Sequence, residues 1–186
     1  MRTLVLILII FFSVSSNSNN FGSNTGLELP RFVSLKSDDA NIRVGPSVNY
    51  PIVLKYTKAN LPLKIIEEYN DWRKIEDIDS NIGWIHKSLI KGERRGIIIS
   101  TDNSNVKLHN IDKGKIFGEI EVGVIVLISK CKKEWCQIQK NNTKGWVNKN
   151  YIWGTNKDEI LNFGFFQILV EQLYKSINWL EGEFNL

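Results

Sequence analysis

The chain has 186 residues, of which 42% are hydrophobic and 24% are charged, and it carries a formal net charge of +4. This composition is that of an ordinary globular protein. The mild basicity favours anionic partners such as membrane surfaces or acidic polymers, but it is too small to indicate a specific nucleic-acid-binding protein. A plain solvated surface accounts for it more simply.

The amino terminus has the order of a secretory signal peptide. One positive charge precedes an unbroken apolar run at residues 4–12, and residues 13–16 are small, with Val14 and Ser16 at the two positions that signal peptidase recognises. The run is shorter than the ~20 residues that span a bilayer. We predict a signal peptide over residues 1–16 and export of the protein. An uncleaved anchor or a buried strand is the alternative.

The segment after the signal peptide has little to bury. Residues 17–25 are rich in Asn, Ser and Gly, a composition typical of a flexible tether. The sequence therefore predicts a flexible linker over residues 17–30, ahead of the first domain.

Two copies of one pattern follow this linker. Three segments recur in the same order: residues 41–44, 71–75 and 83–85 return as residues 105–108, 134–138 and 145–147. Such a recurrence indicates a duplicated small domain, and tryptophans, glycines and apolar pairs are what recur, which is typical of a scaffold. We place the copies at residues 31–94 and 95–156.

Each copy has the pattern of a small all-β domain. In the first copy, polar and apolar residues alternate at 41–44, and turn residues follow at 45–47. Short strands between frequent turn signals favour a barrel or a sandwich. The second copy keeps the order of strands but carries residues 109–111 in place of the Gly-Pro turn, so we expect its binding site to be lost or altered.

The ordered set resembles the bacterial SH3-like (SH3b) domain family. The resemblance rests on Asn-Ile-Arg-Val-Gly-Pro-Ser at 41–47, on Trp72 before a short strand, and on Gly-Trp-Ile at 83–85. It covers residues 33–90 closely and residues 97–153 more loosely. The tandem arrangement is similar to that of secreted two-SH3b proteins of alphaproteobacteria.

The resemblance implies an all-β chain of two tandem small SH3-like barrels. It also implies an exported protein, with the periplasm as the expected compartment, and a partner such as a cell-wall peptide, a glycan or an envelope protein. Domains of this family often bind wall peptides or glycans, or tether an enzyme beside its substrate.

The aromatic residues have two interpretations. Four tryptophans recur between the copies, so core packing is the first. The second is a ligand groove, because aromatic rings flank the groove in which SH3-type folds hold extended peptides. The candidate groove residues are Arg43, Ser47, Tyr50, Tyr56, Tyr69 and Trp72.

Cys131 and Cys136 are the chain's two cysteines. If residues 133–134 form a two-residue hairpin turn, the cysteines face each other in a non-hydrogen-bonded pair, close enough for a disulfide. The aligned residues of the first copy, Glu68 and Arg73, carry opposite charges that suit the same cross-strand position. The oxidising setting of an exported protein favours a structural disulfide over free thiols, a redox pair or metal ligands. No metal site is predicted.

The character of the chain changes after Gly154. Apolar residues recur there at three- and four-residue spacing: Phe166, Leu169, Val170, Leu173, Ile177 and Leu180. This spacing predicts a C-terminal amphipathic helix within a tail over residues 157–186. Packing on a barrel, contact with a membrane surface and contact with another protein all remain open for its apolar side.

The sequence carries no recognisable catalytic motif, and we expect neither an enzyme nor a cofactor. Two histidines leave little capacity for acid–base chemistry at neutral pH. We predict a non-catalytic exported binding module for a cell-envelope ligand such as peptidoglycan peptide. A structural or protein-interaction scaffold in the envelope, or a targeting partner of a cell-wall hydrolase, is the alternative.

Overall fold

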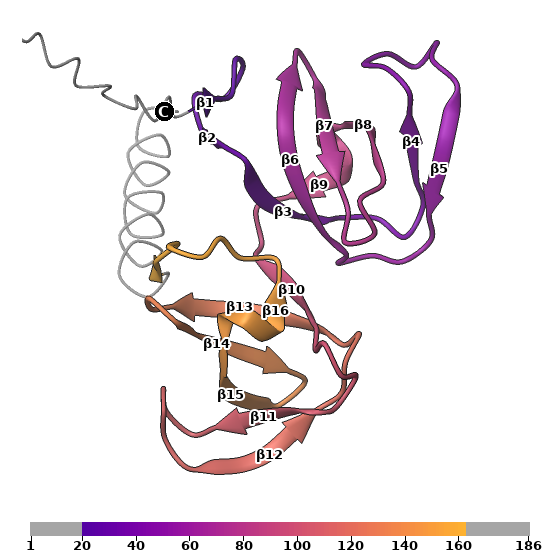
Figure 1. The fold of residues 1–186 in the computed structure, drawn as a ribbon. Helices are drawn as coiled ribbons and strands as arrows, with labels where there is room; N and C mark the ends of the chain where they lie inside the picture. The colour runs from indigo at the N-terminus through magenta and orange to yellow at the C-terminus, as the bar shows by residue number, and fades with distance from the viewer. Residues whose placement is uncertain (1–19, 163–186) are drawn as a thin grey trace, which may run out of the picture.

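The computed structural model describes residues 20–162, which form two curled antiparallel sheets joined in tandem (Figure 1). The predicted all-β class with two SH3-like domains is confirmed. One sheet spans residues 31–91 and has the strand order β5-β4-β8-β7-β6-β3-β9. The other begins at residue 95 and has the equivalent order β12-β11-β15-β14-β13-β10-β16, with β17 beside β13.

Domain 1 is built from short strands whose alternate residues face one core. Its elements are β3 (Arg31–Leu35), β4 (Ala40–Arg43), β5 (Ile52–Tyr56), β6 (Pro62–Tyr69), β7 (Trp72–Glu76), β8 (Ile82–His86), η1 (Lys87–Leu89) and β9 (Ile90–Lys91). The alternation is clear in β7, where Arg73 and Ile75 are buried while Trp72 and Lys74 are partly exposed. The fully enclosed side chains include Leu35, Ile42, Leu63, Ile65 and Ile85.

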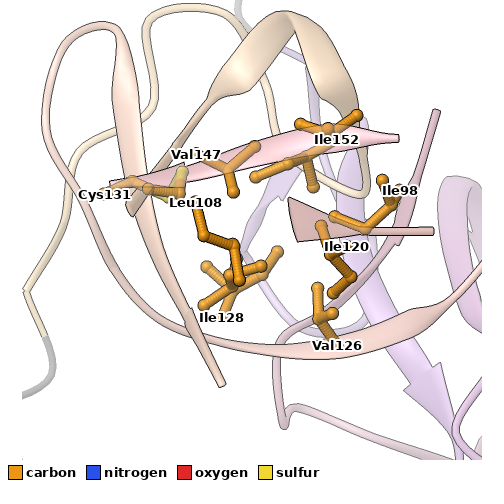
Figure 2. Close-up of a cluster of buried hydrophobic side chains, with 11 residues drawn as sticks. Ile98, Leu108, Ile120, Val126, Ile128, Cys131, Val147 and Ile152 are labelled. Carbon is orange, nitrogen blue, oxygen red and sulfur yellow. A yellow bond between two sulfur atoms is a disulfide. The ribbon is translucent and has the colours of Figure 1, made fainter. Parts of the chain in front are cut away.

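Domain 2 repeats this architecture around its own core (Figure 2). Its elements are β10 (Arg95–Ile98), β11 (Val106–His109), β12 (Ile116–Ile120), β13 (Ile125–Cys131), β14 (Trp135–Lys140), β15 (Thr143–Asn148), η2 (Lys149–Tyr151) and β16 (Ile152–Trp153). Its core residues include Ile98, Leu108, Val126, Ile128, Ile138 and Val147. Each domain therefore buries a separate hydrophobic cluster.

The structure corrects the alignment of the first repeated strand. Arg43 pairs with Trp84, whereas His109 pairs with Trp146. The equivalent of Arg43 is therefore His109, two residues beyond the Lys107 that the sequence repeat indicates. A shift of two residues leaves every side chain on the same face, because strand side chains alternate with a period of two. The alternating pattern alone could not distinguish the two registers.

A bulge turns one residue of each long hairpin into the core. The register shifts between Ile65 and Glu67 in domain 1, and between Ile128 and Lys130 in domain 2. One extra residue reverses the alternation, so the next inward side chains are Glu68 and Cys131.

These two residues occupy one equivalent position, which we call the hairpin site. Glu68 faces Arg73 in domain 1, with Arg73 Nε 3.4 Å from the carboxylate. Cys131 faces Cys136 in domain 2, and the two form a disulfide with their Cα atoms 4.1 Å apart. The predicted pairing register is confirmed in both copies. All four side chains are buried.

The hairpin site of domain 1 anchors the amino-terminal segment. Strands β1 (Asn20–Phe21) and β2 (Glu28–Leu29) form a small hairpin. The carboxylate of Glu68 accepts hydrogen bonds from the Asn24 and Thr25 amides, the Thr25 hydroxyl and the Arg31 guanidinium. The predicted flexible linker over 17–30 does not fit this part of the chain, because a buried carboxylate needs donors and this segment supplies them.

A different extension covers the equivalent place in domain 2. Strand β17 (Leu161–Asn162) pairs with the end of β13, where Leu161 lies opposite Cys131 and packs against the core. The predicted signal peptide and the predicted C-terminal amphipathic helix lie outside the described residues.

The two domains dock through an aromatic contact. Phe32 meets Trp153 edge to face, with ring centroids 5.2 Å apart. The Arg94 guanidinium lies 5.8 Å from the Phe32 ring and donates a hydrogen bond to the Gly154 carbonyl. Asn156 of the second domain also donates to the carbonyl of Pro30. These contacts hold the domains in one arrangement.

We predict that Glu68 makes the stability of domain 1 depend on acid pH. Burial opposes ionisation, but the hydrogen bonds from Arg31, Thr25 and Asn24 outweigh it and lower the pKa of Glu68 from 4.5 to about 2. A lowered pKa contributes stability above pH 4.5 that is lost as the pH falls towards 2, up to about 3 kcal/mol. Urea unfolding of the protein and of Glu68→Gln, followed between pH 7 and pH 2, measures this difference.

The exposed neighbour Glu67 provides the matched control. Glu67→Gln should lose little stability at pH 7, because among residues 20–162 the one ion pair of Glu67 is an exposed pair with Lys74. If the stability of Glu68→Gln and of the unmodified protein depended equally on pH, the attribution of the acid-sensitive stability to Glu68 would be contradicted.

The disulfide should form in exported protein and stabilise domain 2 modestly. Its cysteines are separated by five positions in the chain, so the loop that it closes is short and the expected gain is about 2 kcal/mol. Intact mass after alkylation without reductant should show no added label. A Cys131→Ser, Cys136→Ser double variant should unfold at a lower urea concentration than the unmodified protein. Two alkylated thiols in the exported protein would exclude the bond.

Candidate functional site

Domain 2 contains a surface cavity of about 330 Å³ next to Trp135. The cavity lies where the ends of β11 and β15 meet the start of β14 and the short helix η2. Its walls come from these elements and from the loop before β11: Ser100, Thr101, Asp102, Ser104, Asn105, Val106, Lys107, His109, Trp135, Asn148 and Tyr151. Aromatic rings and small polar side chains therefore line the same cavity, which suits an organic ligand with hydrogen-bonding groups.

His109 and Trp135 form the aromatic wall. Their rings meet edge to face, with centroids 4.8 Å apart and planes at 76°. His109 Nδ1 lies 2.7 Å from the carbonyl oxygen of Gly114. A carbonyl only accepts, so Nδ1 must carry the proton, and Nε2 of the neutral ring is left as an acceptor.

Asp102 places a negative charge at the edge of the cavity. Hydrogen bonds from the Ser100 hydroxyl, then from the Ser104 hydroxyl and amide, lower the pKa of Asp102 to about 2. The carboxylate is consequently ionised at neutral pH. The lining carries both this carboxylate and the cationic Lys107, so the cavity suits a ligand with an ammonium group for Asp102 and an acceptor for Lys107.

The equivalent surface of domain 1 is arranged differently. Trp72 occupies the place of Trp135 but meets His86, with centroids 5.5 Å apart. His86 comes from β8, the strand next to that of Trp72, whereas His109 comes from β11, two strands from that of Trp135 on the same side of the sheet. The His86 Nδ1 atom accepts a hydrogen bond from the Ser88 amide and caps η1. The two tryptophan sites therefore differ in their chemistry.

Three of the six predicted groove residues, Arg43, Ser47 and Tyr50, come together in one turn. Arg43 donates a hydrogen bond to the Tyr50 carbonyl at 2.7 Å, and Ser47 lies in the same turn. The Tyr50 ring covers Gly45, where an added Cβ would lie 2.7 Å from the ring. Arg43, Ser47 and Tyr50 therefore form a local turn cluster at the end of β4.

The other three residues belong to β5, β6 and β7. Tyr56 belongs to the hydrophobic core, where its hydroxyl donates to Asp77 at 2.8 Å, so its predicted place in the groove is corrected. Tyr69 and Trp72 pair across the turn of the β6–β7 hairpin, with Tyr69 exposed and Trp72 partly exposed. None of the six residues lines the cavity beside Trp135.

The remaining recurrent tryptophans are buried on the outer side of each sheet. Lys74 lies over the Trp84 ring, and Lys130 and Lys132 lie over the Trp146 ring, at 5.0 to 5.9 Å from the centroids. Both tryptophans are therefore covered structural residues, as the core interpretation predicts. The lysine side chains cover the outer faces of these two tryptophan rings.

Sequence reasoning missed the cavity in domain 2. Asp102, His109 and Tyr151 are distant in sequence, and no repeated motif includes them. The available signal was that His109 replaces the Gly-Pro turn, which we interpreted as the loss or alteration of a site. The structure instead brings His109 against Trp135.

Two structural features are absent from residues 20–162. These residues contain no group of three or more His, Cys, Asp or Glu side chains arranged to hold a metal ion. In the same range, no helix has the length and apolar character needed to cross a bilayer.

The duplicated strand order defines a small SH3-like domain, present twice. The family profile of the bacterial SH3 domain matches residues 36–92 and 111–154. These matches cover more than half of the sequence, and the chain belongs to this family. A search of curated proteins finds no match.

Several solved structures are similar to the chain. An NlpC/P60 family protein from Bacillus cereus has 10% identity and a TM-score of 0.29, over 66% of this chain and 55% of that one. NlpC2 and NlpC1 from Trichomonas vaginalis have 11% and 15% identity and TM-scores of 0.31 and 0.29, over 68% and 80% of this chain and 48% and 51% of theirs. The chain spans about half the length of these structures.

We predict that the two histidines adopt opposite neutral tautomers. His109 should carry its proton on Nδ1, because that atom donates to the Gly114 carbonyl, whereas His86 should carry it on Nε2, because its Nδ1 accepts from the Ser88 amide. Long-range ¹H–¹⁵N correlation spectra above the histidine pKa distinguish the two forms. The same tautomer in both residues would contradict one of these hydrogen bonds.

Proposed function

We propose that the protein is a non-catalytic exported module that binds a cell-envelope peptide, of the peptidoglycan type, in the cavity beside Trp135. The observation that carries the proposal is the combination of aromatic walls with an ionised carboxylate in one cavity of about 330 Å³. The family resemblance supports the envelope as the source of the ligand, and the predicted signal peptide supports export to the periplasm.

A peptide matches this chemistry better than an apolar ligand does. Trp135 and Tyr151 place aromatic side chains in the lining, which suit a ligand side chain or an extended backbone. Asn105 and Asn148 offer amides that pair with peptide groups. Asp102 offers an anion for the amino group of a diamino acid or a peptide terminus.

The bonding of the histidines supports a role without catalysis. Within residues 20–162, His109 Nδ1 is held by a backbone carbonyl, and His86 Nδ1 by Ser88 two positions further on. Neither imidazole hydrogen-bonds to a carboxylate there, as a general base held by an acidic partner would.

A pull-down with purified peptidoglycan tests the proposal. The unmodified protein should be retained, and Trp135→Ala should weaken binding by about 30-fold, because a buried aromatic contact is lost. Trp72→Ala is the matched control, since it removes the equivalent tryptophan of domain 1 and should leave retention unchanged. The protein alone should release no soluble wall fragments.

The outcomes separate the two domains. Absence of retention of the unmodified protein would reject wall binding. Loss of retention in Trp72→Ala but not in Trp135→Ala would place the site in domain 1.

A protein partner is the second candidate, and the edge strand β5 favours it. This strand ends the sheet of domain 1, and a group of exposed apolar side chains surrounds it: Val44, Val48, Tyr50, Ile52, Val53 and Ile82. Exposed apolar groups beside an open strand edge are typical of protein interaction sites. Crosslinking in intact cells from a photoreactive residue at position 53 should then capture one envelope protein, such as a wall hydrolase or a scaffold component. Capture of no protein would remove this candidate.

A further inference from the structure

A second cavity, of about 440 Å³, lies between the two domains. Domain 1 contributes the loop before β6, with Lys58, Ala59 and Asn60. Domain 2 contributes Arg95, Lys140 and residues 122–125. A smaller cavity of about 230 Å³ shares Arg95, Ile125 and Lys140 with it, so the two form one continuous depression. We call this depression the interdomain cleft.

All the charged residues that line the cleft are positively charged. Its charged lining residues are Lys58, Arg95 and Lys140, and neither cavity has an Asp or Glu in its lining. Arg95 is bonded through Nε to Glu93 at 2.6 Å, which lies outside the lining. Within the described chain its two Nη groups have no protein acceptor, and Lys58 has no ion-pair partner. These donors remain available to a ligand.

Backbone contacts hold the walls of the cleft in place. Asn60 and Gly123 both lie at turn positions with positive φ. The Asn60 amide donates a hydrogen bond to the Leu35 carbonyl, and the Gly123 amide donates one to the Ile98 carbonyl. The contact between Phe32 and Trp153 fixes one domain against the other. The three cations are therefore brought together by the docking of the domains, since Lys58 belongs to one and Arg95 and Lys140 to the other.

We propose that the interdomain cleft binds an anion of the phosphate class that carries more than one negative charge. Within the described chain Lys58 and Lys140 have no acidic partner, and Arg95, whose Nε is bonded to Glu93, keeps its two Nη groups for the oxygens of a phosphate group. The cleft is roomier than one phosphate ion requires, so it accommodates linked phosphates or a phosphate diester chain. It shares no lining residue with the cavity beside Trp135, so this site is independent of the proposed peptide site.

Calorimetric titration of the full exported chain with inorganic pyrophosphate tests the site. The unmodified protein should bind saturably. Each of Lys58→Gln, Arg95→Gln and Lys140→Gln should weaken binding by about tenfold or more, because each removes a charge-assisted hydrogen bond. Lys133→Gln removes the same charge from an exposed turn outside the cleft, and it should leave the affinity unchanged.

Two results would overturn the proposal. One is the absence of saturable pyrophosphate binding by the unmodified protein. The other is equal weakening by Lys133→Gln and Lys58→Gln, which would show attraction to net charge only. Arg95→Gln removes the bond to Glu93 and could disturb the fold, so Lys58→Gln, which breaks no bond in the described chain, is the decisive variant.

Two larger probes then identify the source of the phosphate. Vesicles containing phosphatidylglycerol present it as a lipid headgroup, and a soluble poly(glycerol phosphate) presents it as a wall polymer. Binding of either probe that is lost in Lys58→Gln and kept in Lys133→Gln supports the proposal and names the source. Trp135→Ala should not affect either result, which separates this site from the peptide site.

Discussion

The hairpin site is the constraint on which both domains depend. A bulge in the longest hairpin of each sheet turns one side chain inward, into a place closed to water. A carboxylate there must be satisfied by several donors, because burial of a charge without partners is costly. Glu68 therefore recruits Arg73, Arg31 and the amino-terminal hairpin. The disulfide of domain 2 needs no donors, so its place is covered by the apolar Leu161 of β17. The chemistry of one position thus decides which flanking segment each domain incorporates.

The duplicated barrels have diverged at their tryptophans. Trp72 and Trp135 hold equivalent positions, yet Trp72 meets a histidine from the neighbouring strand and Trp135 meets one from the strand after it. In domain 1 the place of His109 is taken by Arg43, whose guanidinium is bonded to a turn carbonyl. The scaffold keeps its backbone pairing while its surface chemistry changes, because outward positions bear little on the core. A binding site in one copy consequently implies nothing about the other copy.

Docking of the domains creates surfaces that neither has alone. Arg31, the first residue of β3, and Arg94, just before β10, hold equivalent positions, but Arg31 serves the hairpin site while Arg94 reaches across to Gly154 and Phe32. The next position is Phe32 in one domain, where it stacks at the interface, and Arg95 in the other, where it lines the cleft. One duplicated position thus supplies both the contact that joins the domains and a charge in the space between them.

The sequence by itself determined the duplication, the all-β class and the pairing of Cys131 with Cys136, because these follow from local alternation, turn residues and short hairpins. It could not place Tyr56, whose burial depends on Asp77 from a distant loop, or the segment at 20–29, whose order depends on the carboxylate of Glu68. The cavity beside Trp135 and the interdomain cleft were decided only by tertiary structure. Their residues come from separate strands and loops, and a period of two records which face a side chain takes but not which distant side chain it meets.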